Sequence, residues 1–258
     1  MIVFDFYYIY MKSLKEFLFN NTENIIDCHF HGFGKFGFIK PKNKALLMVD
    51  NPTRFNYPLT PYFEKNKELL KEYPFLVVGC DSKETLDLYN KYKNCFGIGE
   101  VKVYKKFYPE TEPNTLTEFE DKQFLIDILE SNIDKPIFIH YDLNKDNYKW
   151  LDEILEKHFD KTIVLCHCGM SEEFNKDEAF ELVRCLQQKH SNLFLDVSWI
   201  ALDYFVQSKH KLSNLDNCRL LYGSDNNRFN QEYYNKMVNI SKYINNKVNL
   251  EILKELAK

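Results

Sequence analysis

The sequence predicts an α/β protein that forms one (β/α)8 barrel, the TIM-barrel fold, as a single domain over residues 1–258. Three observations predict it. Short apolar runs recur eight times along the chain, and amphipathic stretches separate most of them. Continuous apolar runs of this length are typical of strands buried on both faces, as in a parallel sheet. The length of 258 residues also suits one such barrel, which uses roughly 200–250 residues.

The eight predicted strands are rich in Val, Ile, Leu and Phe, and polar or turn residues bound each of them. They cover residues 25–30, 45–50, 75–80, 96–104, 136–141, 162–167, 193–198 and 219–225. Between them, apolar residues at helical spacing predict helices. These helices cover residues 61–73, 82–92, 116–132 and 177–190. We expect residues 1–24 to form an N-terminal extension and residues 231–258 to form one or two C-terminal helices.

The composition is that of an ordinary globular protein, with 45% hydrophobic and 28% charged residues. The net charge of -4 offers no basic field for non-specific nucleic-acid binding, although a local patch is allowed. No apolar run reaches the roughly 18–20 residues of a membrane span. We therefore expect a cytoplasmic protein with a small-molecule substrate and no membrane partner. A nucleic acid is disfavoured as a partner, and a homo-oligomer is left open.

The seven cysteines are odd in number and show no disulfide framework, which favours reduced thiols in a cytoplasmic protein. Cys166 and Cys168 flank His167 and could be mistaken for a thiolate metal site. Strand alternation directs both thiols away from the face of His167. Core packing is therefore the preferred interpretation of these two residues.

The first predicted strand ends in a His-x-His pair, His29 and His31. Side chains two residues apart in a strand share a face, so both imidazoles are expected to point the same way at the carboxyl end of the strand. Two imidazoles in that arrangement can bind one divalent metal ion. The Gly32-Phe33-Gly34 segment that follows lets the backbone pass close to such a site.

Other ionisable side chains stand at the carboxyl ends of later strands. They are Glu100 and Lys102 in the fourth, His140 in the fifth, His167 in the sixth and Asp225 in the eighth. These strand ends meet at one rim of a barrel, where active sites lie. Each residue alone has a structural alternative: a core histidine, an ion pair inside the barrel or a turn cap. Burying all of them together is costly unless a partner balances them, so the set favours a metal site.

As an ordered set over residues 27–225, these residues resemble the amidohydrolase superfamily. The segments FGIGEVKVY, PIFIHY and LCHCG resemble its TatD-type branch. The segment LLYGSD is more similar to the branch that includes decarboxylases and lactonases, because TatD-type proteins usually carry Glu-Thr-Asp there. The resemblance implies a TIM barrel with one or two divalent metal ions, most often Zn2+, with Mn2+ or Mg2+ as alternatives.

The resemblance also implies roles for the matching residues. His29 and His31 would bind the more buried metal, and Asp225 would bind it and serve as general acid and base. His140 and His167 would bind a second metal, or His167 would polarise the substrate. These roles define the expected metal ligands and catalytic residues.

The ligand that bridges two metals has two candidates. Glu100 matches the Gly-Glu of the TatD-type branch, whereas other branches use a carboxylated lysine. Lys102 shares the face of Glu100 by strand alternation and is the alternative. Glu100 is preferred because it needs no modification.

Three residues are candidates for substrate binding. Arg54 follows the second strand, and Arg228 follows Asp225. The planar fork of either arginine suits a carboxylate or phosphate. Tyr141 follows the fifth strand and is expected to line the pocket. Trp199 either forms a wall of the pocket or packs a helix.

The leading functional hypothesis is a metal-dependent hydrolase that cleaves an amide, ester, lactone or phosphoester bond of a small molecule. A metal lowers the pKa of its water, and Asp225 would take the proton and return it to the leaving group. The alternatives are a TatD-type metal-dependent deoxyribonuclease, a metal-dependent decarboxylase and a catalytically inert barrel that serves as a binding protein.

Overall fold

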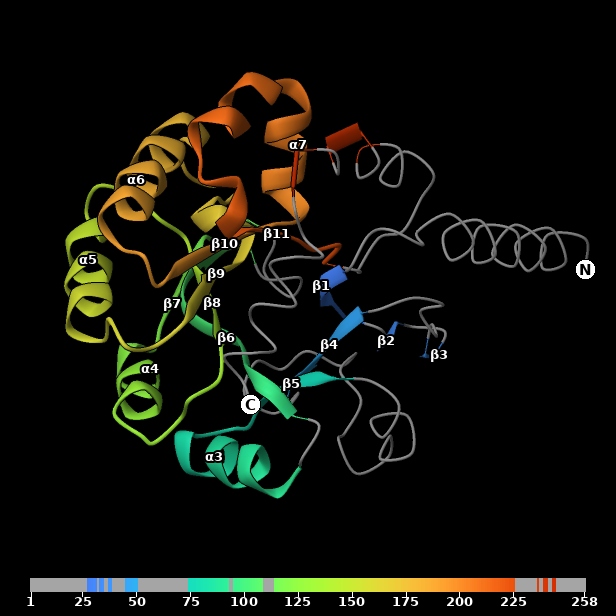
Figure 1. Ribbon diagram of the computed structural model, residues 1–258, viewed down its shortest axis with the longest axis vertical. Coiled ribbons are helices and arrows are strands. Elements are labelled where there is room, and N and C mark those ends of the chain that lie inside the picture. Colours follow the sequence, from blue (N-terminus) through green and yellow to red (C-terminus); the bar gives the residue numbers. More distant parts are fainter. Residues whose placement is uncertain are drawn as a thin grey trace, which may run out of the picture.

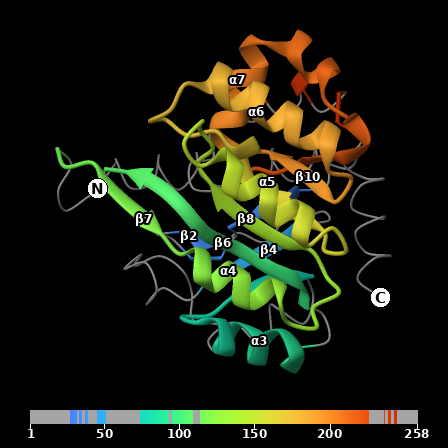
Figure 2. The same cartoon turned by 90° about the vertical axis from the view of Figure 1, so that its left-hand side faces the viewer.

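Parallel strands form a barrel, and helices lie on its outer side in both views of the ribbon (Figures 1 and 2). This computed structural model describes residues 27–31, 33–34, 37–38, 45–50, 74–92, 95–108, 114–225, 236, 239–240 and 243–244. The expected N-terminal extension, the helix at 61–73 and most of the C-terminal tail lie outside these residues.

The eight parallel strands follow one another in chain order around the barrel. They are β1 (Asp27–Phe30), β4 (Ala45–Asp50), β5 (Phe75–Val78), β6 (Cys95–Phe107), β8 (Ile137–Tyr141), β9 (Ile163–Leu165), β10 (Leu193–Val197) and β11 (Leu220–Tyr222). Two further strands, β2 (Phe33–Gly34) and β3 (Gly37–Phe38), pair antiparallel with each other. Each of the eight strands predicted from the apolar runs is therefore confirmed, as is the α/β barrel.

The last strand returns to the first through backbone hydrogen bonds. The N–H groups of Ser224 and Asp225 both donate to the carbonyl of His29, over 3.2 and 2.8 Å. The half-buried carboxyl group of Asp27 accepts from the backbone N–H of Ser224 (2.9 Å) and of His29 (3.1 Å). These contacts bring the carboxyl ends of β1 and β11 together, so His29 and Asp225 become neighbours.

The helices on the outer side begin at polar caps. They are α3 (Ser82–Lys91), α4 (Lys122–Leu129), α5 (Tyr148–Lys157), α6 (Lys176–Lys189) and α7 (Trp199–Gln207), with short 3-10 turns η3 (Cys166–Gly169), η4 (Lys209–Asn214) and η5 (Asn217–Arg219). The side chains of Asp81, Asp121 and Asn175 accept hydrogen bonds from the first turns of α3, α4 and α6. The predicted helices at 82–92 and 177–190 are confirmed. None of the helices among the described residues is long and apolar enough to cross a membrane.

The predicted helix at 116–132 is only partly correct. Its first part is strand β7 (Thr117–Glu120), which pairs antiparallel with the end of β6, and α4 begins only after the Asp121 cap. In β7, half-buried Thr117 and Phe119 alternate with exposed Glu118 and Glu120. This period of two outweighs the helical spacing that Leu116 and Phe119 suggested.

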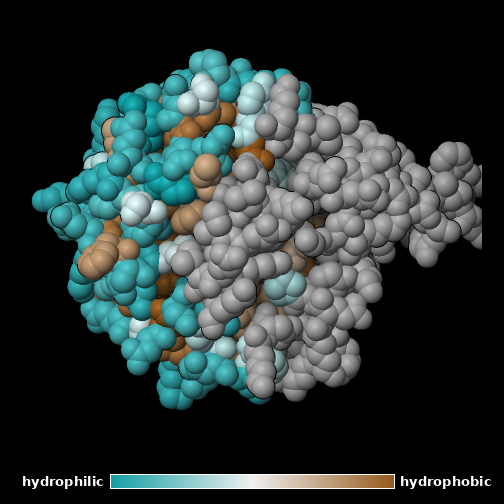
Figure 3. Space-filling view, viewed as in Figure 1, coloured by the Kyte–Doolittle hydropathy of each residue, from teal (hydrophilic) through white to brown (hydrophobic). Residues whose placement is uncertain are grey.

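Apolar side chains fill two layers. One lies inside the barrel and includes Cys28, Met48, Phe138 and Cys166. The larger layer lies between the barrel and the helices. Hydrophilic side chains cover most of the described surface on the face shown in Figure 3. The polar side chains at the carboxyl ends of the strands lie outside this inner apolar layer and are available to form a site.

Gly97 marks a close approach between β6 and the segment that precedes β8. A Cβ at this position would lie 2.1 Å from the carbonyl oxygen of Pro136, which is backbone and cannot move aside. We expect Gly97→Ala to lower the free energy of unfolding by about 1–3 kcal/mol, measured by urea denaturation. Gly79→Ala is the comparison and should cost less, because its Cβ would meet side-chain atoms of Glu84 and no backbone atom. An equal loss in both variants would contradict the close approach.

The carboxyl group of Asp27 makes stability depend on pH. Burial raises its pKa from 3.8 to about 7, against opposing hydrogen bonds from Ser224 and His29. The folded chain therefore holds a proton here that the unfolded chain releases, and this contribution to stability is lost as the pH rises toward and through 7.

Asp27→Asn cannot ionise, so its stability relative to the native chain should rise by roughly 1–4 kcal/mol between about pH 5 and about pH 8. Urea unfolding of the two proteins with a chelator present measures this difference. The surface variant Asp160→Asn is the control and should show no such trend. A pH-independent gap between Asp27→Asn and the native chain would refute the account.

Candidate metal centre

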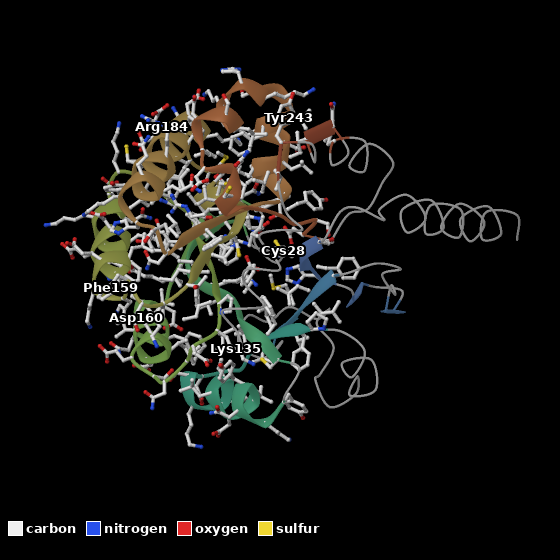
Figure 4. The ribbon with its side chains drawn as sticks, in the orientation of Figure 1. Cys28, Lys135, Phe159, Asp160, Arg184 and Tyr243 are labelled. Carbon is white, nitrogen blue, oxygen red and sulfur yellow. The ribbon has the colours of Figure 1, made fainter. Side chains whose placement is uncertain are left out.

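Six ionisable side chains meet at the carboxyl ends of the parallel strands. They are the predicted residues His29, His31, Glu100, His140, His167 and Asp225. His31 and Asp225 are 15% and 12% exposed at their side chains, and the other four are buried. Figure 4 labels Cys28, the residue before His29, among the side chains at the centre of the barrel. His29 and His31 lie at the carboxyl end of β1, Glu100 lies in the middle of the long strand β6, and His140 lies near the end of β8. His167 and Asp225 follow β9 and β11.

The His-x-His pair faces one point. The Nε2 atoms of His29 and His31 lie 3.0 Å apart, as expected from their spacing in the strand. Asp225 places Oδ1 3.4 Å from Nε2 of His31 and 3.7 Å from Nε2 of His29. Glu100 places Oε2 3.8 and 3.9 Å from the same two nitrogens. Four donor atoms from three strand ends therefore surround one small volume.

A buried hydrogen-bond bridge holds two of the histidines. Nδ1 of His29 donates to Oδ2 of Asp196 over 2.6 Å, and the hydroxyl of Ser198 donates to the same oxygen over 2.7 Å. The Ser198 oxygen then accepts from Nδ1 of His167 over 2.8 Å. With both Nδ1 atoms donating, the Nε2 atoms of His29 and His167 are left as the coordinating atoms.

His140 is bonded differently. Its Nδ1 lies 2.6 Å from Oε1 of Glu100, and its Nε2 lies 3.0 Å from Oδ1 of Asp142. Carboxylates thus contact both ring nitrogens. Lys102, the alternative bridging ligand, places Nζ 3.6 Å from Oε2 of Glu100, which confirms that the two side chains share a face.

The charges of these groups depend on one another. Burial disfavours the imidazolium form of His29, but Asp196, Asp225 and Glu100 outweigh it and raise the pKa to about 10. Burial likewise opposes ionisation of Glu100, yet Lys102 and His140 hold its pKa well below the usual range. The pKa of Asp225 is also lowered, because His167, His29 and His31 outweigh its burial. Buried carboxylates here require positive charge beside them, which protons or a metal cation can supply.

Ligand atoms in the described part of the chain form three groups compact enough to hold a metal ion. Two of them, His29–Glu100–His167 and His29–His31–Asp225, share His29 and together form one set. The two Nε2 atoms at 3.0 Å suit ligands of one ion, because zinc–nitrogen bonds of about 2.0–2.1 Å place neighbouring ligands roughly 3 Å apart. The donor set of imidazole and carboxylate therefore fits a divalent metal.

The third group, His29, Cys166 and Asp196, fits a metal less well. Burial, with Glu100 and Asp196 nearby, raises the pKa of the Cys166 thiol well above its ordinary value. A thiol must lose its proton to bind a metal. Asp196 is also engaged by His29 and Ser198. The first two groups are therefore the better candidate site.

Strained backbone gathers around the site. Among the described residues, those with positive φ that are not glycine are His167 (54°), Cys168 (53°), Trp199 (43°) and Asp225 (48°). All four follow the carboxyl ends of β9, β10 and β11. Such conformations cost of order 1–3 kcal/mol each and are concentrated at functional sites. The strain supports a functional reason for directing these side chains toward one point.

This backbone corrects two expectations about the sixth strand. β9 ends at Leu165, so His167 lies in the turn η3 and not in a strand. Strand alternation therefore does not govern its neighbours. Cys166 packs inside the barrel, while Cys168 lies in the outer layer with Sγ 3.5 Å from the carbonyl oxygen of Asp196. Core packing holds for both thiols, although the alternation argument was wrong.

The structure tests only one of the three expected substrate-binding residues. Tyr141 is wrong as a pocket residue, because it alternates with inward-facing His140 and lies buried in the outer layer. Its hydroxyl donates to the carbonyl of Asn147 over 3.0 Å. Arg54 and Arg228 lie outside the described residues.

Sequence reasoning missed three site residues, Asp142, Asp196 and Ser198. The sequence around each of them contains a pattern that could have identified it. Asp142 follows His140 by two residues, and Asp196 and Ser198 form a polar i, i+2 pair at the end of an apolar strand. That spacing is the same one that identified His29 and His31.

Comparisons with known proteins test the predicted fold. No family model and no curated protein matches the sequence. The structure is similar to an uncharacterized TIM-barrel protein from Bordetella bronchiseptica, with a TM-score of 0.52 and 16% identity over 83% of this chain and 78% of that one. It is also similar to a protein from Pseudomonas putida described as a 2-pyrone-4,6-dicarboxylic acid hydrolase, with a TM-score of 0.53 and 14% identity over 90% of this chain and 98% of that one.

A third similar structure is an amidohydrolase from Burkholderia multivorans, with a TM-score of 0.47 and 13% identity over 78% of this chain and 75% of that one. The two likenesses above 0.5 confirm the TIM-barrel fold.

The bridge through Asp196 predicts a measurable effect of a residue that is no metal ligand. Removing the hydroxyl in Ser198→Ala frees His167 to rotate and leaves Asp196 with one donor fewer. We expect zinc affinity, measured by competition with a chromophoric chelator, to fall about 10–100-fold. Ser171→Ala removes another buried hydroxyl, which accepts from the backbone of Glu173, and should bind zinc as the native chain does. Equal affinity of native protein and Ser198→Ala would show that the bridge does not position the ligands.

Proposed function

We propose that the protein is a metal-dependent hydrolase of the amidohydrolase type that acts on a small molecule. The observation that carries this proposal is the convergence of three imidazole Nε2 atoms and two carboxylates at one rim of the barrel. The Nε2 atoms of His29, His31 and His167 face the carboxylates of Glu100 and Asp225. A site that combines imidazole with carboxylate suits zinc or manganese better than magnesium.

We propose a single divalent ion per chain. His29, His31, His167, Glu100 and Asp225 would hold it, since the two compact ligand groups share His29. His140 belongs to neither group and is engaged by Glu100 and Asp142. This assignment takes the first of the two options, one metal ion or two, that the resemblance implied. It also makes a carboxylated Lys102 unnecessary, because the lysine pairs with Glu100 as an ammonium.

The chemistry of hydrolysis divides between the ion and the protein. A bound divalent ion would supply Lewis acidity, which lowers the pKa of water and polarises a substrate oxygen. Asp225 is the most exposed carboxylate of the set and is positioned to accept the proton of the attacking water. The protonated Asp225 then returns that proton to the leaving group.

His140 would support the same reaction by positioning a metal ligand. Asp142 and Glu100 hold its ring between two carboxylates, which favours the protonated ring. Burial opposes this form, but Asp142 and Glu100 outweigh it and raise the pKa of His140. Both ring N–H groups are engaged in this way, so His140 would act by fixing the carboxylate of Glu100, a proposed metal ligand.

Metal analysis of the purified protein tests the proposal. We expect close to one zinc or manganese per chain, loss of hydrolysis of a chromogenic ester and lactone panel after chelation, and recovery on metal addition. A decarboxylase would use the same centre and would be recognised by release of carbon dioxide, and a TatD-type nuclease by cleavage of plasmid DNA. A protein that retains no metal and takes up none of zinc, manganese or magnesium would refute the proposal and support the inert barrel.

The role of Asp225 predicts a separation of binding from turnover. Asp225→Asn keeps an oxygen that can contact the metal but cannot take a proton at neutral pH. Metal content should stay near one per chain, while kcat falls about 100- to 10,000-fold. Elemental analysis and steady-state kinetics on the same preparation measure the two effects. Native turnover in this variant would remove Asp225 from the proposed mechanism.

A further inference from the structure

One ammonium group stands at the mouth of the candidate site. Nζ of Lys105 lies 5.9 Å from the ring centroid of Trp199, which is within the range of a cation–π contact. The Trp199 ring in turn lies edge-on against His167, with centroids 5.2 Å apart. Lys105 belongs to β6 and Trp199 follows β10, and β8 and β9 lie between these strands in the barrel. The side chains of Lys105 and Trp199 therefore meet on the side of the barrel where β8 and β9 lead to His140 and His167.

A bulge in β6 directs Lys105 to this side. Lys102 pairs with His140, but Tyr104 already pairs with Tyr141, so β6 carries one extra residue here. The extra residue reverses the alternation that follows. Tyr104 packs against Tyr141 in the outer layer, and Lys105 faces the same side as Lys102. Without the bulge, Lys105 would point away from the site.

Hydrogen bonds hold the backbone of β6 on both sides of Lys105. The N–H of Asp142 donates to the carbonyl of Tyr104 over 3.1 Å. The N–H of Lys106 donates to Oδ2 of Asp142 over 2.8 Å. Asp142 also holds His140, so the position of Lys105 is tied to the floor of the site. The base of its side chain is therefore anchored, as a specificity residue requires.

Among the described residues, no carboxylate neutralises the charge of Lys105. No carboxylate in the described part of the chain lies within ion-pair distance of its Nζ, whereas Lys102 contacts Glu100. The neighbouring Lys106 points to the other side, with Nζ 5.7 Å from the Phe174 ring in the outer layer. Cation–π contacts contribute only about 0.5–1 kcal/mol at exposed sites, so the Lys105 ammonium keeps its capacity to bind an anion.

We propose that Lys105 and Trp199 form a subsite for a carboxylate group of the substrate. This inference rests on the proposed function and names its substrate class, a small carboxylic acid. A single ammonium beside a flat indole suits a singly charged, planar group. A phosphate dianion would meet only one ammonium here, which leaves its second charge without a partner among the described residues. The carboxylate is a recognition group at the mouth, and the bond that breaks lies deeper, at the metal ligands.

A set of metal-binding probes tests the subsite. The probes are hydroxamates with a carboxylate at the far end of a two-, three- or four-carbon chain, each compared with its uncharged methyl ester. Binding to zinc-loaded protein is measured by titration calorimetry. We expect at least one acid to bind roughly 10-fold or more tightly than its ester. Lys105→Met should abolish this preference without changing ester affinity, and Lys105→Arg should restore most of it.

The adjacent lysine provides a matched control. Lys106→Met removes an ammonium one residue away that faces the outer layer, and it should keep the full preference for the acid. An acid preference that survives in Lys105→Met, or its absence for every chain length in the native protein, would overturn the subsite while leaving the metal centre intact.

Failure of the proposed function is recognised separately, because the zinc content is measured first. If no metal binds, the subsite is tested through quenching of Trp199 fluorescence by anionic iodide and neutral acrylamide. Trp150→Phe makes Trp199 the only tryptophan, since the chain has two. Lys105→Met should then reduce quenching by iodide and not by acrylamide. An unchanged iodide effect would overturn the subsite in this case as well.

Discussion

A single buried oxygen, Oδ2 of Asp196, organises the candidate site. It accepts hydrogen bonds from Nδ1 of His29 and from the hydroxyl of Ser198, and Ser198 holds His167. Asp196 is fully buried, so its charge is tolerated only while these donors are present. The same bonds leave both Nε2 atoms directed at the ligands from β1, β6 and β11. One constraint, the satisfaction of a buried carboxylate, thus determines the tautomer and direction of two metal ligands from different strands.

Closure of the barrel brings the remaining residues of the site to these two histidines. Closure between β1 and β11 brings Asp225 within 3.7 Å of His29, although nearly the whole described chain separates them in sequence. The bulge in β6 then adds Lys105 at the mouth, and Asp142 links that segment to His140. Metal ligands, proton-transfer groups and the proposed recognition group therefore rest on backbone that hydrogen bonds hold in place. Such support is what catalysis by positioned groups requires.

Much of this arrangement could be predicted from the sequence, because it follows from two simple patterns: continuous apolar runs and the i, i+2 spacing of side chains on one face of a strand. Continuous apolar runs identified all eight barrel strands, and the i, i+2 rule placed His29 beside His31 and Glu100 beside Lys102. The rules fail where the backbone leaves the regular strand. His167 reaches the site through a positive-φ turn, which no period predicts. Asp196 was missed because its pairing with Ser198 two residues on identifies no function until the fold brings His29 and His167 to the same oxygens.

The central claim is that imidazole and carboxylate, and not thiolate, bind one cation at the strand ends. Zinc K-edge X-ray absorption of the zinc-loaded protein tests it most directly, because Cys28 and Cys166 lie just beneath the proposed ligands in the inner layer. The account predicts only nitrogen and oxygen ligands at about 2.0–2.2 Å, with the multiple scattering of imidazole rings. A sulfur shell at about 2.3 Å would place the metal on Cys166 and Asp196 instead and would contradict the proposed centre.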